Sequence, residues 1–126
     1  MVCPVVLFIT LNDENPNWSA SVGYTVTFSE PVTGVDVIDF SLTTADLTGV
    51  SVTNVSGSGD IYIVTVDTGS GAGTLRLDVS DDDSIINRLG NPLGGVGAGN
   101  GDFSWGEEYG VRLYMVYLPL VFRNGP

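Results

Sequence analysis

The sequence predicts an all-β fold, a sandwich of about seven short strands, and three observations carry this prediction. Apolar residues recur at every second position in several segments, which is the periodicity of a half-buried strand. No segment has the apolar spacing of an amphipathic helix of useful length. The 126 residues include 17 Gly, and glycine favours the tight turns that join short strands. A chain of this length corresponds to one domain.

The first half of the chain contains four predicted strands. Apolar alternation over residues 5–9 predicts the first of them; the same segment resembles the apolar part of a secretory signal, without a basic start or a clear cleavage site. Residues 22–28 alternate Val, Tyr, Val and Phe with Gly and Thr, and this strand ends before Pro31, which has no backbone N–H to donate. Residues 37–42 and 50–55 predict two shorter strands.

The second half contains three more predicted strands and one long connection. Residues 62–66 and 75–79 alternate, and the Arg and Asp of the second strand are expected to face solvent. Residues 80–102 are rich in Gly, Asp and Asn and predict a long loop, and residues 109–113 form the last strand. The side chains expected between the two sheets are Tyr24, Val26, Phe28, Phe40, Leu42, Val64, Val66, Leu75, Leu77 and Val79.

Two regions follow from this pattern. Residues 1–113 form a single sandwich domain, and residues 114–126 form an apolar C-terminal tail. The tail alternates, so it either extends the last strand, pairs with the edge of another chain or is a partly ordered terminus. It is interrupted by Pro119 and is too short to cross a bilayer, so no membrane span is expected.

The composition excludes several classes of function. The chain has 15 acidic and 4 basic residues, a net charge of −11, no His and one Cys. All four basic residues are Arg, so no lysine is available for a phosphate loop or a Schiff base. Histidine-based nucleophilic catalysis and Cys/His zinc sites are also excluded. Nucleic acid is not an expected partner, because phosphate binding depends on clustered Lys and Arg. Self-repulsion favours a monomer.

Acidic residues gather in three clusters, and calcium is one interpretation of them, because it binds to carboxylate and carbonyl oxygens in Asp-rich loops. The alternative is a solvated acidic surface. The clusters are Asn12, Asp13, Glu14 and Asn15; Asp36 and Asp39; and Asp78, Asp81, Asp82, Asp83 and Asp102. The third cluster lies at the start of the long loop, and a loop of that length usually has a function or an ordering ligand. The predicted ligands are therefore Asp78, Asp81, Asp82, Asp83 and Asn87.

Two kinds of activity remain to be weighed. A pair of carboxyls is enough for glycoside hydrolysis, but a seven-strand sandwich of this size leaves little chain to build a cleft, so no enzyme is expected. Exposed aromatic rings can stack on sugars, and Trp18 and Trp105 are the candidates. Packing of Trp105 at the edge of the sandwich, with Trp18 covering a loop, is the simpler interpretation.

Three segments resemble the bacterial immunoglobulin-like domains of large secreted or cell-surface proteins. They are YTVTFSEPVTGVDVIDFSL (24–42), YIVTVDTGSGAGTLRLDVSDDDSI (62–85) and GNPLGG (90–95). The resemblance covers residues 11–111, and its most specific parts are 28–32 and 90–92.

This resemblance implies a Greek-key immunoglobulin-like sandwich located outside the cell, with the signal peptide absent from this chain. It implies a non-catalytic spacer or adhesion unit, stiffened by calcium if the acidic loop binds the ion. Its partners would be neighbouring domains of a parent protein or a surface ligand. The alternative function is a carbohydrate-binding module.

Overall fold

The computed structural model describes residues 3–15, 17–97 and 99–112. The described chain is all-β, apart from one 3-10 turn. The longer strands are β1 (Val6–Leu11), β2 (Ser21–Phe28), β4 (Phe40–Thr48), β5 (Ser51–Ser58), β6 (Ile61–Asp67), β7 (Ser70–Val79) and β9 (Glu108–Val111). The short elements are β3 (Val32–Thr33), η1 (Val37–Asp39) and β8 (Ile86–Asn87). The C-terminal tail predicted at 114–126 lies outside the described residues.

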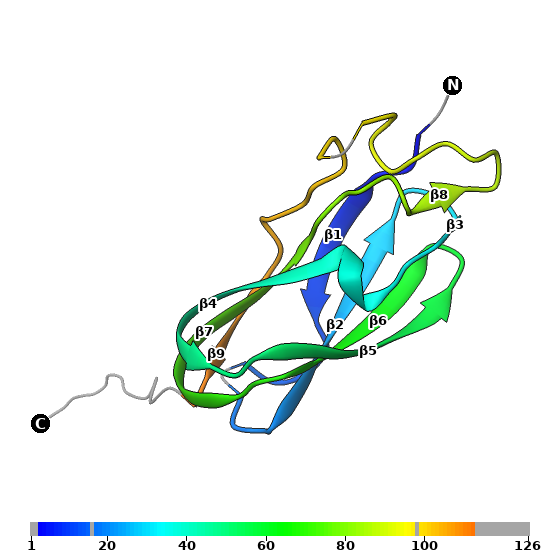
Figure 1. Cartoon of the computed structure of the whole chain (residues 1–126). Coiled ribbons are helices and arrows are strands. Elements are labelled where there is room, and N and C mark those ends of the chain that lie inside the picture. The colour runs from blue at the N-terminus through cyan, green and yellow to red at the C-terminus, as the bar shows by residue number, and fades with distance from the viewer. Residues whose placement is uncertain (1–2, 16, 98, 113–126) are drawn as a thin grey trace, which may run out of the picture.

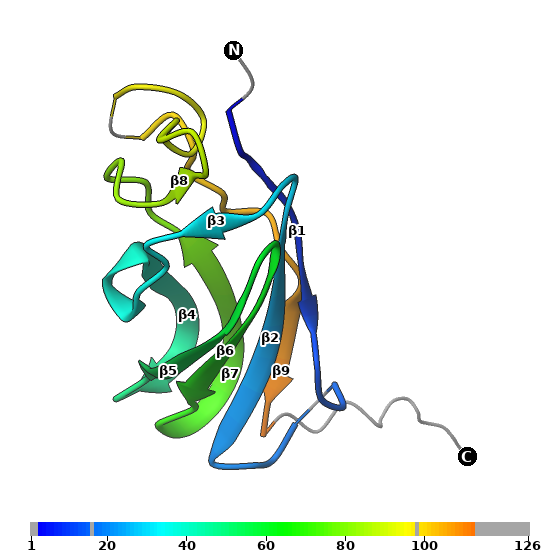
Figure 2. The same ribbon diagram turned by 90° about the vertical axis from the view of Figure 1, so that its right-hand side faces the viewer.

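The strands form two larger antiparallel sheets and one small one. The strand order is β1-β2-β6-β5 in the first sheet and β4-β7-β9 in the second, and β3 pairs with β8. The two larger sheets lie against each other with the apolar core between them, as Figures 1 and 2 show. This arrangement is consistent with a β-sandwich. No helix among the described residues is long and apolar enough to cross a membrane.

Nine of the ten predicted core residues are buried, which confirms the inward faces of β2, β6 and β7; Leu42 is half-buried. Two pairs of rings meet edge to face in this core. Tyr24 and Tyr109 have centroids 5.2 Å apart, and Phe28 and Tyr62 have centroids 5.7 Å apart. The buried hydroxyls are satisfied, because Tyr24 donates to the Leu75 carbonyl at 2.9 Å and Tyr62 donates to a backbone carbonyl of β3.

Two predicted strands differ from the structure. The bulge between Val6 and Phe8 breaks the alternation of β1, so Ile9 is buried while Val5 and Leu7 are exposed. The strand predicted at 37–42 begins only at Phe40, because residues 37–39 form the 3-10 turn η1. Asp39 Oδ2 accepts the Asp36 backbone N–H at 2.7 Å, and a local side-chain bond of this kind competes with strand pairing.

The stretch predicted as a long loop forms a folded cover over one end of the sheets. It contains β8, and two of its side chains, Ile85 and Leu93, enter the core, as does Phe103 directly after it. The Phe103 backbone exchanges two hydrogen bonds with Val79 at the end of β7. The chain begins at this same end, since Pro4 accepts a hydrogen bond from Gly94, and it leaves β9 at the other end (Figures 1 and 2).

Candidate functional site

The acidic loop after β7 directs its carboxylates to backbone amides. Asp81 is 7% exposed; its Oδ1 accepts the Asp83 N–H and its Oδ2 accepts the Gly101 N–H, both at 3.0 Å. Asp83 Oδ2 accepts the Gly97 N–H at 2.9 Å, and Asp102 Oδ1 accepts the Asp81 N–H at 2.6 Å. Three of these four bonds join residues 14 to 21 positions apart, so they order the loop, which is the role that the sequence analysis gave to calcium.

The five predicted metal ligands are not brought together. Asp78, expected to face solvent, is 8% exposed; its Oδ1 lies 2.7 Å from Arg76 Nε, and its Oδ2 accepts a hydrogen bond from Thr43. Asn87 belongs to β8, where its amide donates to Glu30 and its oxygen accepts two backbone N–H groups. In the described part of the chain, no three acidic or Cys side chains lie close enough together to hold a metal ion.

One buried oxygen of the acidic loop is left without a donor among the described residues. Asp83 Oδ1 is buried and accepts no hydrogen bond from the described residues, and the same is true of Glu30 Oε2 elsewhere. Asp83 also has a φ of 67°, a left-handed conformation that is rare outside glycine and Asn or Asp. Calcium binding by this loop stays a prediction, and Asp83 is the residue on which it now depends most.

A second carboxylate, Asp39, is fully buried beside this loop. Burial raises the pKa of Asp39, and the carboxylates of Asp82 and Asp36 add to that rise. Ser84 Oγ lies 2.7 Å from Asp39 Oδ1 and 2.5 Å from Asp82 Oδ1. A hydroxyl has one proton and cannot donate to both. Both contacts are satisfied when Asp39 is protonated and donates to Ser84, which in turn donates to Asp82.

The pKa of Asp82 shifts in the opposite direction to that of Asp39, which fits this arrangement. Hydrogen bonds from the Ser84 hydroxyl and backbone lower the pKa of Asp82. The pair therefore consists of one carboxyl that favours its proton and one that favours its charge. The sequence analysis placed Asp36 and Asp39 in a separate cluster, because Asp39 and Ser84 are 45 positions apart and no local pattern signals their contact.

The cluster of residues 12–15 forms hydrogen bonds with strands β2 and β9. Asp13 Oδ2 accepts the Gly23 N–H of β2 at 2.8 Å, and Asn15 Oδ1 accepts the Gly110 N–H of β9 at 2.7 Å. The Asn12 side chain accepts a hydrogen bond from Thr25. These contacts explain the polar residues of this connection as structural bonds; nothing in them favours a calcium site.

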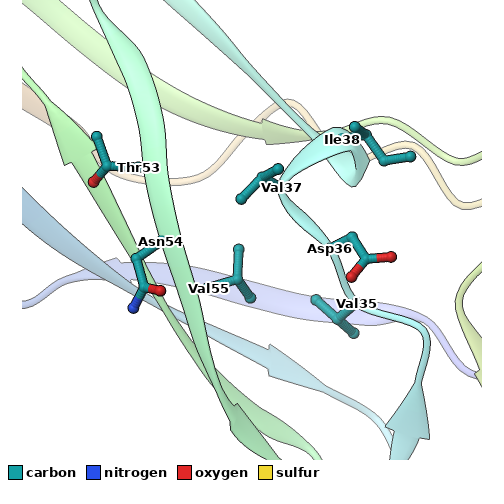
Figure 3. A pocket seen from close by; sticks show the side chains of 7 residues that line it. All are labelled: Val35, Asp36, Val37, Ile38, Thr53, Asn54 and Val55. Atoms are coloured by element: carbon teal, nitrogen blue, oxygen red, sulfur yellow. The ribbon is translucent and has the colours of Figure 1, made fainter.

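Two of the hollows on the described part of the chain are open to solvent and could admit a ligand. The larger, of about 410 Å³, lies between η1 and β5 and is lined by residues 35–38 and 53–55. Figure 3 shows Val37 and Val55 pointing toward each other across it, while Ile38 points away. Asp36 is its one carboxylate, so the hollow is an apolar contact surface without the pair of carboxyls that glycoside hydrolysis needs.

The smaller hollow, of about 200 Å³, is lined by one of the two predicted sugar contacts, Trp105, together with polar side chains. Its lining residues are Val5, Val6, Asn100, Gly101, Asp102, Phe103 and Trp105. Trp105 is 73% exposed; its ring contacts Phe103, which pairs with the end of β7, so it lies against the sheet edge with most of its surface open. Trp18 is 55% exposed. It follows Asn17, which forms a β-bridge with Val111 at the end of β9, whereas Trp105 comes before the start of β9. The two tryptophans therefore do not form one platform.

Comparison with known proteins adds no relative. No family model, curated protein or solved structure matches this chain.

Proposed function

We propose that this chain is a non-catalytic immunoglobulin-like module of a secreted or cell-surface protein, acting as a spacer or adhesion unit. The observation that carries the proposal is the path of the chain. It enters at the end covered by the acidic loop and leaves at the opposite end, beyond β9 (Figure 2). A module with this geometry can be joined to others end to end, so that each copy adds length.

The strand order supports the immunoglobulin-like assignment. When the seven longer strands are lettered in chain order, β1-β2-β6-β5 and β4-β7-β9 become A-B-E-D and C-F-G, the two sheets of a constant-type immunoglobulin domain. The inter-sheet disulfide of antibody domains has no counterpart, since Cys3 is the one cysteine. Two edge-to-face aromatic pairs contribute to the core of this chain.

The side-chain chemistry supports a binding or structural role over a catalytic one. Each of the two hollows has a single carboxylate in its lining, and the buried carboxylates of the acidic loop are engaged with backbone amides. The apolar hollow beside the edge strand β5 is the surface best suited to adhesion, since an edge strand offers unpaired backbone groups to a partner.

A tandem of two copies tests the spacer role. Small-angle scattering should give a maximum dimension about twice that of one copy, because the two ends of the module lie on opposite sides. A tandem that is as compact as one copy, although both copies unfold cooperatively, would contradict the proposal. Location outside the cell is tested separately, by protease treatment of intact source cells followed by detection of the chain.

A further inference from the structure

The hollow beside Trp105 has the features of a sugar-binding site, and these features are independent of the spacer role. The indole of Trp105 rests on Phe103, with centroids 4.9 Å apart and an angle of 43° between the rings. Phe103 is 5% exposed and belongs to the core, so it fixes the position of the indole. A large aromatic ring is thus held in place with most of its surface open to solvent, where it is available to a ligand.

Two polar side chains border the ring, and each is anchored through one atom. Asp102 uses Oδ1 to accept the Asp81 N–H, and Asn100 uses Nδ2 to donate to the Val96 carbonyl at 2.7 Å. Among the described residues, no donor binds to Asp102 Oδ2 or Asn100 Oδ1. The lining of the hollow therefore contains an exposed aromatic ring and two acceptor oxygens without a donor among the described residues, which is the usual composition of a small ligand site.

These groups match a sugar ring. Its C–H face stacks on an indole, and its hydroxyls donate to carboxylate and amide oxygens. No basic side chain lines the hollow and the chain has a charge of −11, so an anionic saccharide is disfavoured. A volume of about 200 Å³ is below that of sites for drug-sized ligands, so it fits one sugar unit of a longer chain.

A quaternary ammonium ligand is the other chemistry that an aromatic ring and a carboxylate can recognise. Such cations are held in cages of several exposed rings, and here Phe103 is buried, so Trp105 forms a platform and not a cage. We propose that the hollow formed by Trp105, Asp102 and Asn100 binds a single unit of a neutral polysaccharide.

Affinity electrophoresis of the intact chain in gels containing cellulose derivatives, xylan, mannan, soluble chitin derivatives or β-glucan tests this proposal. The chain should be retarded by at least one of these. Trp105→Ala should lower the affinity at least about tenfold, because an aromatic anchor is removed. Asp102→Asn should weaken binding as well, since it keeps Oδ1 for the loop and replaces the free acceptor with a donor. Trp18→Ala is the matched control and should be retarded like the parent chain.

A fluorescence measurement reports on the site directly. In Trp18→Phe, Trp105 is the single tryptophan, and its emission should shift to the blue when an oligosaccharide of the retarding polysaccharide is added. The tryptophan variants should unfold at the midpoint of their parent within a few degrees, since both indoles are largely exposed. Asp102→Asn should unfold somewhat earlier, because it replaces the charged acceptor of the Asp81 N–H with a neutral one, so its binding is measured well below its own midpoint. Absence of retardation by every polysaccharide, equal retardation of Trp105→Ala, or an emission shift with choline and not with sugars would each overturn the proposal.

Discussion

The Asp81 carboxylate links the start of the acidic loop to its end through two hydrogen bonds, and Asp81→Ala would remove both. Its carboxylate accepts the N–H groups of Asp83 and Gly101, both at 3.0 Å, from a position that is 7% exposed. A hydrogen bond to a charged group contributes about 1.5–3 kcal/mol. Because this site is close to the surface and water can reach the freed amides, we expect a total loss of about 2–4 kcal/mol for the two bonds.

The loss is measurable as a fall in melting temperature. For a chain of this size, 1 kcal/mol corresponds to about 4 °C, so the midpoint should fall by about 8–16 °C. Asp81→Asn keeps one acceptor and turns an NH₂ group toward the other amide, so it should lose at least half as much. Urea unfolding gives the free energy, and hydrogen exchange at Gly101 and Asp83 should speed up in both variants.

The control is Asp60→Ala, which removes the same charge from an exposed turn where the carboxylate accepts no hydrogen bond from the described residues. Its stability should stay within about 0.5 kcal/mol of the parent. An Asp81→Ala variant as stable as this control, with unchanged exchange at Gly101, would refute the role given to the carboxylate.

Three further predictions concern the core, pH and calcium. Phe28→Ala should cost about 3–5 kcal/mol in urea unfolding, because the ring is 1% exposed; a loss below 1 kcal/mol would contradict its central position. The folded pKa of Asp39 is raised above the unfolded value of about 3.9, so the folded state binds more protons and stability falls as pH rises from about 4 through the folded pKa. Asp39→Asn should remove that fall in unfolding free energy between pH 3 and 8, and parallel curves for the two proteins would show that Asp39 does not titrate as described. Millimolar calcium should raise the melting temperature of the parent above its value in chelator, and the double variant Asp82→Asn, Asp83→Asn should show no rise; equal midpoints throughout would leave a solvated acidic loop.

Strand periodicity made the larger part of the fold predictable. In β2, β6 and β7 the inward residues were assigned from alternation alone, because one face of each strand packs on the core and the other does not. The start of β4 was not predictable in this way. Val37 and Ile38 are apolar, like strand residues, but the bond between the Asp36 amide and the Asp39 carboxylate closes a 3-10 turn.

The site was less predictable because its contacts join residues far apart in sequence. The sequence shows a cluster of acidic residues that includes Asp81 and Asp102, and calcium binding was one interpretation of that cluster. The structure places each beside a particular backbone amide, and no periodicity encodes such pairings. Likewise, the sequence allows Trp105 to be either a sugar contact or a residue packed at the sheet edge. Its position on Phe103, beside an open hollow, depends on how the whole stretch from residue 80 to residue 105 folds.

The placement of the first and last strands determines how the molecule responds to tension. β1 begins at the covered end and lies antiparallel to β2, and β9 ends at the other side and lies antiparallel to β7. A pull on the two ends therefore acts along both strands, so their ladder hydrogen bonds are loaded together and do not open one after another. Arg112, just beyond β9, donates hydrogen bonds to the carbonyls of Thr68 and Gly69 in the turn before β7 and to that of Gly71 at the start of β7. The terminal strands are thus loaded in shear along their whole length, an arrangement that would suit the spacer or adhesion role proposed above.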